Sequence, residues 1–238
     1  MILPTTNKEE QLLRVGHKFI AGVDEVGRGP LAGPVVAGSV IFNFPLKAEI
    51  LNLKSGISQK LESQKFIKSD EFSRTLIRDS KLLSEKQRWE AYKWVLDNAM
   101  AWGIGIVSHR EIDELGIRIA SLLAMEKAVQ EMSQIPDVVL IDGRDVIGRN
   151  VDVYQEAIVK GDRDIFSIAA ASIIAKVTRD EIMKKIDKKF PQYDFAKHKG
   201  YGTAEHRRCI EKYGLCEIHR RSFHLRVSEL TRNRTNKH

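Results

Sequence analysis

Two apolar runs rich in valine and isoleucine lie near the start of the chain, at residues 19–26 and 34–42. Runs of this length, separated by glycine and proline, are typical of β-strands. A short helix that ends near Arg14 is predicted before them, with Thr6 or Asn7 as its N-cap. The chain is therefore expected to begin with one helix and two strands.

Helical and extended patterns alternate through the following residues. The sequence SEKQ at 84–87 has the residues of a capping box, and the apolar face after it predicts a helix to about residue 101. The apolar segment at 137–141 is typical of a buried strand. The other predicted elements are strands at 102–107 and 151–159 and helices at 111–132, 166–190 and 203–213. Strands that first pair and then alternate with helices predict an α/β domain with a mixed sheet.

The connection at 43–78 is long, polar and rich in lysine, with little periodicity. A segment of this kind within a compact domain is typical of an insertion. The chain beyond residue 190 contains one predicted helix and many basic residues. We expect a main domain over 1–190, with 43–78 as an insertion, and a C-terminal helical, basic segment over 191–238.

Composition narrows the classes of function. The 238 residues carry a formal net charge of +7, which favours an anionic partner, and nucleic acid fits better than a membrane surface. Two cysteines are too few for a disulfide framework or a cysteine-based zinc site. The sequence has neither an apolar run near the roughly 18 residues of a membrane span nor the pattern of a signal peptide. We expect a soluble, cytoplasmic protein.

Four acids stand at the predicted ends of strands: Asp24 and Glu25 near the end of the first strand, Asp142 after the strand at 137–141, and Asp162 after the strand at 151–159. Strand ends are where α/β proteins place ligand-binding groups. If these acids converge, their oxygen ligands select Mg²⁺ or Mn²⁺. Two such ions activate a water and stabilise the leaving oxygen in phosphodiester hydrolysis.

Each acid also has an ordinary explanation. Neighbouring residues of a regular strand point to opposite faces, so Asp24 and Glu25 share a site only if the strand twists or ends there. Without further context the pair is equally typical of a surface ion pair, and Asp142 followed by glycine is a common turn. Asp164 and Asp180 compete with Asp162 for the fourth position.

Six segments in order resemble the ribonuclease HII family: DEVGRG at 24–29, DSKLLS at 79–84, IDG at 141–143, KGD with SIAAASIIAKVTRD at 160–180, HKGYGT at 198–203 and IHRRSF at 218–223. The resemblance implies an RNase H-like fold for residues 1–190, with a mixed central sheet flanked by helices. It also implies a monomeric, metal-dependent endonuclease that cleaves RNA in RNA–DNA hybrids and cuts 5′ to single ribonucleotides in duplex DNA. The products would carry 3′-hydroxyl and 5′-phosphate ends.

The resemblance also implies roles for individual residues. Asp24, Glu25, Asp142 and Asp162 correspond to the metal ligands and catalytic acids, and Asp162 displaces its competitors only by its place in the KGD motif. The substrate-binding residues implied are Gly27, Arg28 and Gly29, which read the ribose and hold a phosphate; Tyr201, which stacks on the following deoxyribose; and Lys81 and Lys176, which contact phosphates.

Three other functions compete with this interpretation. A dinucleotide site at Gly27, Gly29 and Gly33 fails because a strand, not a phosphate-binding helix, is predicted after it. A non-catalytic hybrid-binding module would have the same basic surface but no need for four converging acids. The sister ribonuclease HIII carries an extra N-terminal domain, and too few residues precede the first predicted strand for one.

Overall fold

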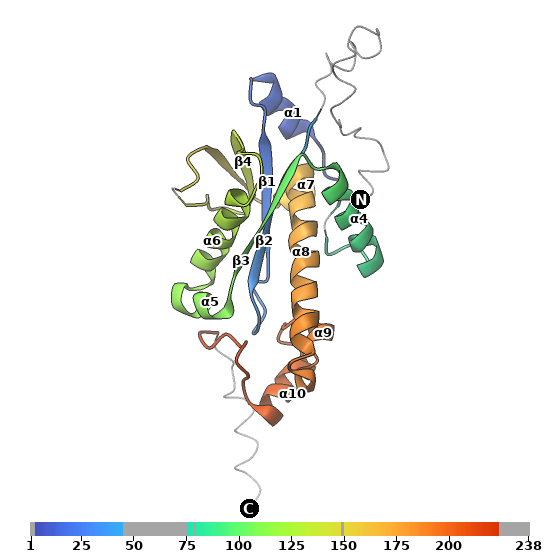
Figure 1. Cartoon of the computed structure of the whole chain (residues 1–238), viewed down its shortest axis with the longest axis vertical. Helices are drawn as coiled ribbons and strands as arrows, with labels where there is room; N and C mark the ends of the chain where they lie inside the picture. Colours follow the sequence, from blue (N-terminus) through green and yellow to red (C-terminus); the bar gives the residue numbers. More distant parts are fainter. Residues whose placement is uncertain (1–2, 45–75, 79, 149, 224–238) are drawn as a thin grey trace, which may run out of the picture.

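A five-stranded mixed sheet forms the centre of the protein (Figure 1). The computed structural model describes residues 3–44, 76–78, 80–148 and 150–223. In chain order the elements are α1 (Asn7–Arg14), β1 (Ile20–Val26), β2 (Val35–Ile41), α4 (Glu85–Asn98), β3 (Ala101–Val107), α5 (His109–Leu115), α6 (Ile117–Gln130), β4 (Val138–Asp142), β5 (Tyr154–Ile158), α7 (Gly161–Asp164), α8 (Phe166–Asp187), a 3₁₀ turn (Pro191–Tyr193), α9 (Phe195–His198) and α10 (Ala204–Tyr213).

The strands lie in the order β3-β2-β1-β4-β5. Strands β1, β2 and β3 form an antiparallel meander, whereas β4 pairs in parallel with β1 and β5 pairs in parallel with β4. This order confirms the predicted mixed sheet. It also makes β1 the central strand, with an antiparallel neighbour on one side and a parallel neighbour on the other.

Helices cover both faces of the sheet (Figure 1). Alternate residues of β1 point to opposite faces, so Ala21 and Val23 pack on the side of α6, while Ile20 packs on the side of α8. Helix α4 lies against α8, where Val95 joins a core cluster with Ile173. The position of a residue along its strand therefore determines which face of the sheet its side chain joins.

Helix α8 approaches the sheet closely. A Cβ atom built on Gly22 would lie 2.2 Å from the carbonyl carbon of Ser167, and one on Gly38 would lie 2.5 Å from the carbonyl oxygen of Ala171. The facing residues of α8 include Ser167 and Ala171, which are small and fully buried. Glycines on the strands and small residues on the helix together bring the α8 backbone against the centre of the sheet.

Several predicted boundaries were wrong. The helix expected at 111–132 is two helices, α5 and α6, because Gly116 between them has φ 76°, which interrupts the helical path. The strand expected at 151–159 is limited to β5, and α8 ends at Asp187 rather than at residue 190. The proposed insertion at 43–78 lies mostly outside the described residues.

The described C-terminal elements pack at the end of α8 that is distant from α1 (Figure 1). Tyr193, Phe195 and Ile218 share a buried cluster with Met183 of α8 and with Ala32 of the loop after β1. We keep the division of the chain at residue 190 as a proposal. Within the described residues, no helix combines the length and apolar character that crossing a bilayer requires.

Candidate active site

Three carboxylates from distant parts of the chain meet at one side of the sheet. Asp24 of β1, Asp142 at the end of β4 and Asp162 of α7 each offer an oxygen, and these oxygens lie within 4.8 Å of one another. Asp24 and Asp162 are buried, with exposures of 4% and 6%. The structure therefore brings together three of the four acids expected from the sequence.

The register of β1 against β4 explains this meeting. The parallel pairing ends with Val23 opposite Ile141, so Asp24 and Asp142 are the next residues on their strands. Both fall on the α8 face because side chains alternate along a strand and the preceding residues, Val23 and Ile141, point to the α6 face. Asp162 follows β5, the parallel neighbour of β4, in the short helix α7.

Strand β1 continues to Val26, the predicted end, and Glu25 is paired with Ala37 of β2. Glu25 is not part of the three-carboxylate cluster. The Glu25 carboxylate is nonetheless close enough for its charge to raise the pKa of Asp24 and for the charge of Asp142 to raise the pKa of Glu25. Its carboxylate lies 3.3 Å from Nη1 of Arg28.

The cluster is strained electrostatically. Burial, together with the neighbouring charges of Glu25 and Asp142, raises the pKa of Asp24 well above its ordinary value. Burial and the charge of Asp162 raise the pKa of Asp142. Burial also raises the pKa of Glu25 to about 7, although Arg28 opposes the shift. Carboxylates crowded in this way require a shared proton or a cation between them.

The donor set fits a divalent metal ion. All three clustered ligands are carboxylate oxygens, and Mg²⁺ and Mn²⁺ are hard cations that prefer oxygen ligands. No histidine or cysteine joins the three acids in the part of the chain that the structure describes. The cluster is therefore a candidate centre for Mg²⁺ or Mn²⁺.

A hydroxyl pair borders the cluster on the α8 side. Ser172 of α8 hydrogen-bonds to the carboxylate of Asp24, which partly offsets the rise in its pKa. The hydroxyl of Ser80 lies 3.1 Å from that of Ser172. Lys81 donates to Asp162 at 3.2 Å, so this predicted phosphate contact reaches the acids in the structure. The two serines were not predicted as site residues, because neither Ser172 on an alanine-rich helix nor Ser80 in a turn gives a functional signal in the sequence.

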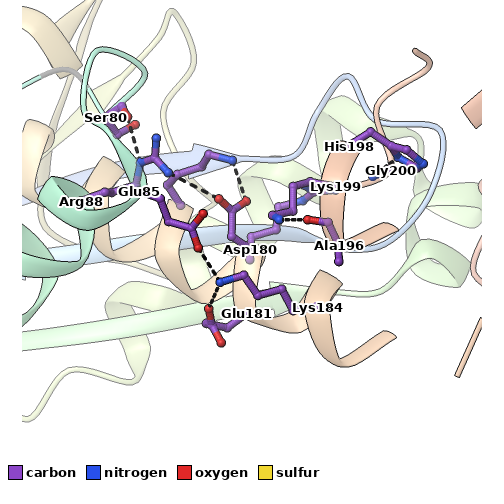
Figure 2. A network of polar contacts seen from close by, with 12 residues as sticks. Ser80, Glu85, Arg88, Asp180, Glu181, Lys184, Ala196, His198, Lys199 and Gly200 are labelled. Atoms are coloured by element: carbon purple, nitrogen blue, oxygen red, sulfur yellow. Dashed lines mark hydrogen bonds and ion pairs between the residues drawn. The ribbon is translucent and has the colours of Figure 1, made fainter. Parts of the chain in front are cut away.

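Figure 2 shows a polar network around Arg88 and Asp180, and Lys176 belongs to it through Asp180. The ammonium group of Lys176 donates to Asp180 at 2.6 Å, and burial lowers its pKa. Arg88 lies 3.6 Å from Asp180 and donates to the main-chain oxygens of Ser80 and Leu83. Asp180 thus belongs to an ion-pair network, which agrees with its exclusion as a metal ligand, and Arg88 fixes the segment that carries Lys81.

The predicted substrate-reading residues lie together. A Cβ atom on Gly29 would lie 3.8 Å from Cε1 of Tyr201, so the tyrosine ring stands beside the glycine. The Tyr201 residue is 42% exposed and the Arg28 side chain 54% exposed. The main chain joins the two loops, because the amide of Leu31 donates to the carbonyl of Gly200 at 2.8 Å.

Three buried histidines form hydrogen bonds that hold the loop containing Tyr201, and two of them, His219 and His206, are bonded to each other. The Cys216 amide donates to Nδ1 of His219, so the His219 proton is on Nε2 and is donated to Nε2 of His206, 3.1 Å away. The His206 proton is then on Nδ1, which donates to the carbonyl of Tyr201 at 3.0 Å. His198 accepts from the Gly200 amide. The sequence does not predict these contacts, because they arise from the tertiary fold.

Comparisons with known proteins identify related sequences and a similar structure. A family model described as ribonuclease HII matches residues 63–226. The ribonuclease HII of Acetivibrio thermocellus is 46% identical over 90% of this chain and 73% of its own length, and that of Caldicellulosiruptor saccharolyticus is 42% identical over 90% and 91%. The crystal structure of ribonuclease H2 from Pyrococcus horikoshii OT3 is similar, with a TM-score of 0.65 and 25% identity over 92% of this chain and all of that one.

Replacing one clustered acid is expected to stabilise the metal-free protein. A carboxyl whose pKa is raised by folding destabilises the native state at pH values above the pKa of the unfolded chain, because the unfolded chain ionises more readily. Asp24→Asn removes this effect, and relief of about 1 kcal/mol raises the Tm of a domain of this size by about 2–4 °C. Circular dichroism melts in EDTA at pH 8 measure the change.

Asp145→Asn is the matched control. Asp145 is paired with Arg118 at 2.6 Å, and the hydrogen bond from Arg118 lowers the pKa of Asp145. Its replacement therefore removes a favourable charge and is expected to give no increase in Tm. A lower Tm for Asp24→Asn than for the wild-type protein would contradict the account of the cluster.

The histidine series gives a second prediction. Burial lowers the pKa of both His206 and His219 to about 4, so both rings stay neutral at pH 6. Long-range ¹H–¹⁵N spectra at pH 6 are expected to show His206 protonated on Nδ1 and His219 on Nε2. The histidines outside the series provide internal references, and a doubly protonated ring at either position would refute the assignment.

Proposed function

Because the chain belongs to the ribonuclease HII family and is an endoribonuclease of the ribonuclease H type, we propose that it hydrolyses the RNA strand of RNA–DNA hybrids and cuts 5′ to single ribonucleotides in duplex DNA. The products carry 3′-hydroxyl and 5′-phosphate ends. The observation that carries the proposal is the buried cluster of Asp24, Asp142 and Asp162.

These three acids would hold the metal ions, with Glu25 as the fourth ligand. Glu25 is adjacent to Asp24, and its carboxylate would have to leave Arg28 to join them. Bound Mg²⁺ or Mn²⁺ supplies activation of a water and stabilisation of the leaving oxygen. Asp24, in the centre of the sheet, is the acid best placed to serve two ions.

The other residues bind and orient the substrate. The main chain at Gly27 and Gly29 approaches the ribose 2′-hydroxyl, the group that distinguishes RNA from DNA. The exposed side chain of Arg28 contacts a phosphate. Tyr201 stacks on the deoxyribose that follows the ribonucleotide, where a second ribose would crowd the ring. Together they select an RNA-to-DNA junction.

Lys81 and Lys176 have different environments. Lys81 has a 74% exposed side chain that already reaches Asp162, and we propose that it contacts a phosphate near the metal ions. Lys176 is 17% exposed and bound to Asp180, so its contact with a phosphate would require exchange of this partner. We further propose that the protein acts as a monomer in the cytoplasm.

A non-catalytic hybrid-binding module is the second candidate function. Such a module needs a cationic surface, whereas buried acids beside a phosphate are unfavourable without metal. The raised pKa values of Asp24 and Asp142 therefore favour the nuclease. Activity assays separate the two functions directly.

The first test is the cleavage of a duplex that contains one ribonucleotide, with Mg²⁺, with Mn²⁺ and with EDTA. Asp142→Asn removes a charged ligand and is expected to lower kcat at least about 100-fold, equivalent to about 2.7 kcal/mol in the barrier. Binding of the duplex is expected to change little. Cleavage by the variant at the wild-type rate would refute the ligand assignment, and binding without cleavage by the wild-type protein would favour the hybrid-binding module.

Tyr201→Ala tests whether Tyr201 recognises the RNA-to-DNA junction. Loss of an aromatic stack costs about 1–3 kcal/mol, so kcat/KM on a single-ribonucleotide duplex is expected to decrease about 5- to 150-fold. A continuous RNA–DNA hybrid should be affected less. Tyr154→Ala, which changes a half-exposed tyrosine on β5, is the control. Equal losses by Tyr201→Ala on both substrates would exclude the stacking role.

A further inference from the structure

Two buried arginines hydrogen-bond to the loop at residues 27–34, here called the reader loop. Arg179 comes from the middle of α8 and is fully buried, and Arg220 follows α10 and is 2% exposed. The two side chains approach the loop from elements that are 41 residues apart (220 − 179). Neither residue has a role in the function proposed above.

Both guanidinium groups donate only to main-chain carbonyls of the reader loop. Arg220 donates to Gly27 at 2.6 Å, Arg28 at 3.0 Å, Gly33 at 2.9 Å and Pro34 at 3.2 Å. Arg179 donates to Pro34 at 2.9 Å and to Ala32 at 3.3 Å, and its buried Nη1 has no hydrogen-bond partner in the described structure. The arginines therefore bind both ends of the loop.

The same contacts orient the amides of the loop. The peptide bonds of the described chain are trans, so each N–H points opposite to the carbonyl of the preceding residue. Because the carbonyls of Gly27 and Arg28 face Arg220, the amides of Arg28 and Gly29 point away from it. Two amide donors are thus presented on the side of the loop that is turned away from the buried guanidinium.

Arg179 also contacts both Gly27 and Tyr201, the two parts of the site that we propose to recognise the RNA-to-DNA junction. Its guanidinium carbon lies 5.8 Å from the centre of the Tyr201 ring. A Cβ atom on Gly27 would lie 2.4 Å from its Nε, and Gly27 has φ +104°, so only glycine fits against this arginine. A single side chain therefore contacts both the glycine turn and the stacking tyrosine.

The charge on these arginines is offset only from a distance, by Asp180 for Arg179 and by Asp113 for Arg220. Among the described residues, no carboxylate lies within 4.0 Å of either guanidinium. Burial lowers the pKa of Arg179, and burial with the nearby charge of Arg179 lowers the pKa of Arg220 to about 9. Burying unpaired charge is costly, so two such residues at one loop point to a purpose other than stability.

We propose that Arg179 and Arg220 are positioning residues that fix the reader loop with the Arg28 and Gly29 amides turned toward the substrate. This inference rests on the proposed function. Both the conformation of the reader loop and the residues that touch the sugar then distinguish a ribonucleotide from a deoxyribonucleotide. The ligand is a duplex with a single ribonucleotide, recognised by its 2′-hydroxyl and the adjacent phosphate.

Arg220→Lys tests the proposal, because it keeps the charge but cannot reproduce the four hydrogen bonds. Dissociation constants are measured in Ca²⁺, which permits binding without turnover, for a one-ribonucleotide duplex and the matched all-DNA duplex. We expect the preference for the ribonucleotide duplex to fall about tenfold, equivalent to about 1.4 kcal/mol, while all-DNA binding changes less than about twofold. An equal loss on both duplexes leaves the preference unchanged and would overturn the proposal, because it indicates a merely structural role.

Control variants make each outcome decisive. Arg14→Lys changes an exposed arginine on α1, at the opposite end of the molecule, and should leave both dissociation constants unchanged (Figure 1). If Arg220→Lys does not fold, Arg179→Lys replaces it, because Arg179 of α8 binds the same loop. The same fall in preference for the ribonucleotide duplex is then expected. A wild-type protein without preference between the duplexes would contradict the proposed function, whereas a wild-type preference retained in both folded variants would contradict this inference alone.

Discussion

The parallel register of β1 against β4 determines where the acids of the site lie. With Val23 opposite Ile141, the next residue on each strand is an aspartate, and strand alternation turns both toward α8. A shift of one residue would move either acid to the other face of the sheet. The close approach of α8 to Gly22 and Gly38 then surrounds Asp24 with protein, which excludes water and raises its pKa.

The site joins two groups of buried charge. Asp24, Asp142 and Asp162 form an acidic side that is unfavourable without a cation. Arg179 and Arg220 form a basic side that hydrogen-bonds to the loop after β1. Under the proposed function, divalent ions would balance the acidic side and the arginines would hold the loop that recognises the ribonucleotide. These roles would explain why a fold retains buried charges that do not stabilise the protein by themselves.

Much of this arrangement could be predicted from the sequence. The mixed sheet followed from two early strands and the later alternation of strands and helices, and the acids were identified by their places near strand ends. The strand alternation rule raised an objection to placing Glu25 beside Asp24, and Glu25 is not among the three clustered acids. Strand β1 ends at Val26, as predicted, because pairing with β2 extends the strand after pairing with β4 has stopped.

Other features could not be predicted because they depend on contacts between distant segments. A buried arginine such as Arg179 resembles a surface arginine in a helical pattern, and only the tertiary structure shows that it binds the carbonyl of Pro34. The same limit applies to His206 and His219, whose rings meet across 13 residues. By contrast, the break at Gly116 had a local signal, since glycine interrupts helices.

The central claim is that the three-carboxylate cluster is completed by divalent metal ions. Titration calorimetry of the metal-free protein with Mn²⁺ at pH 6, repeated in buffers with different heats of ionisation, tests it most directly. The account predicts saturable binding accompanied by proton release, because the pKa values of the ligands are raised and the ligands must ionise to bind. Absence of saturable binding, or binding that persists unchanged when Asp24 and Asp142 are both replaced by asparagine, would contradict the account.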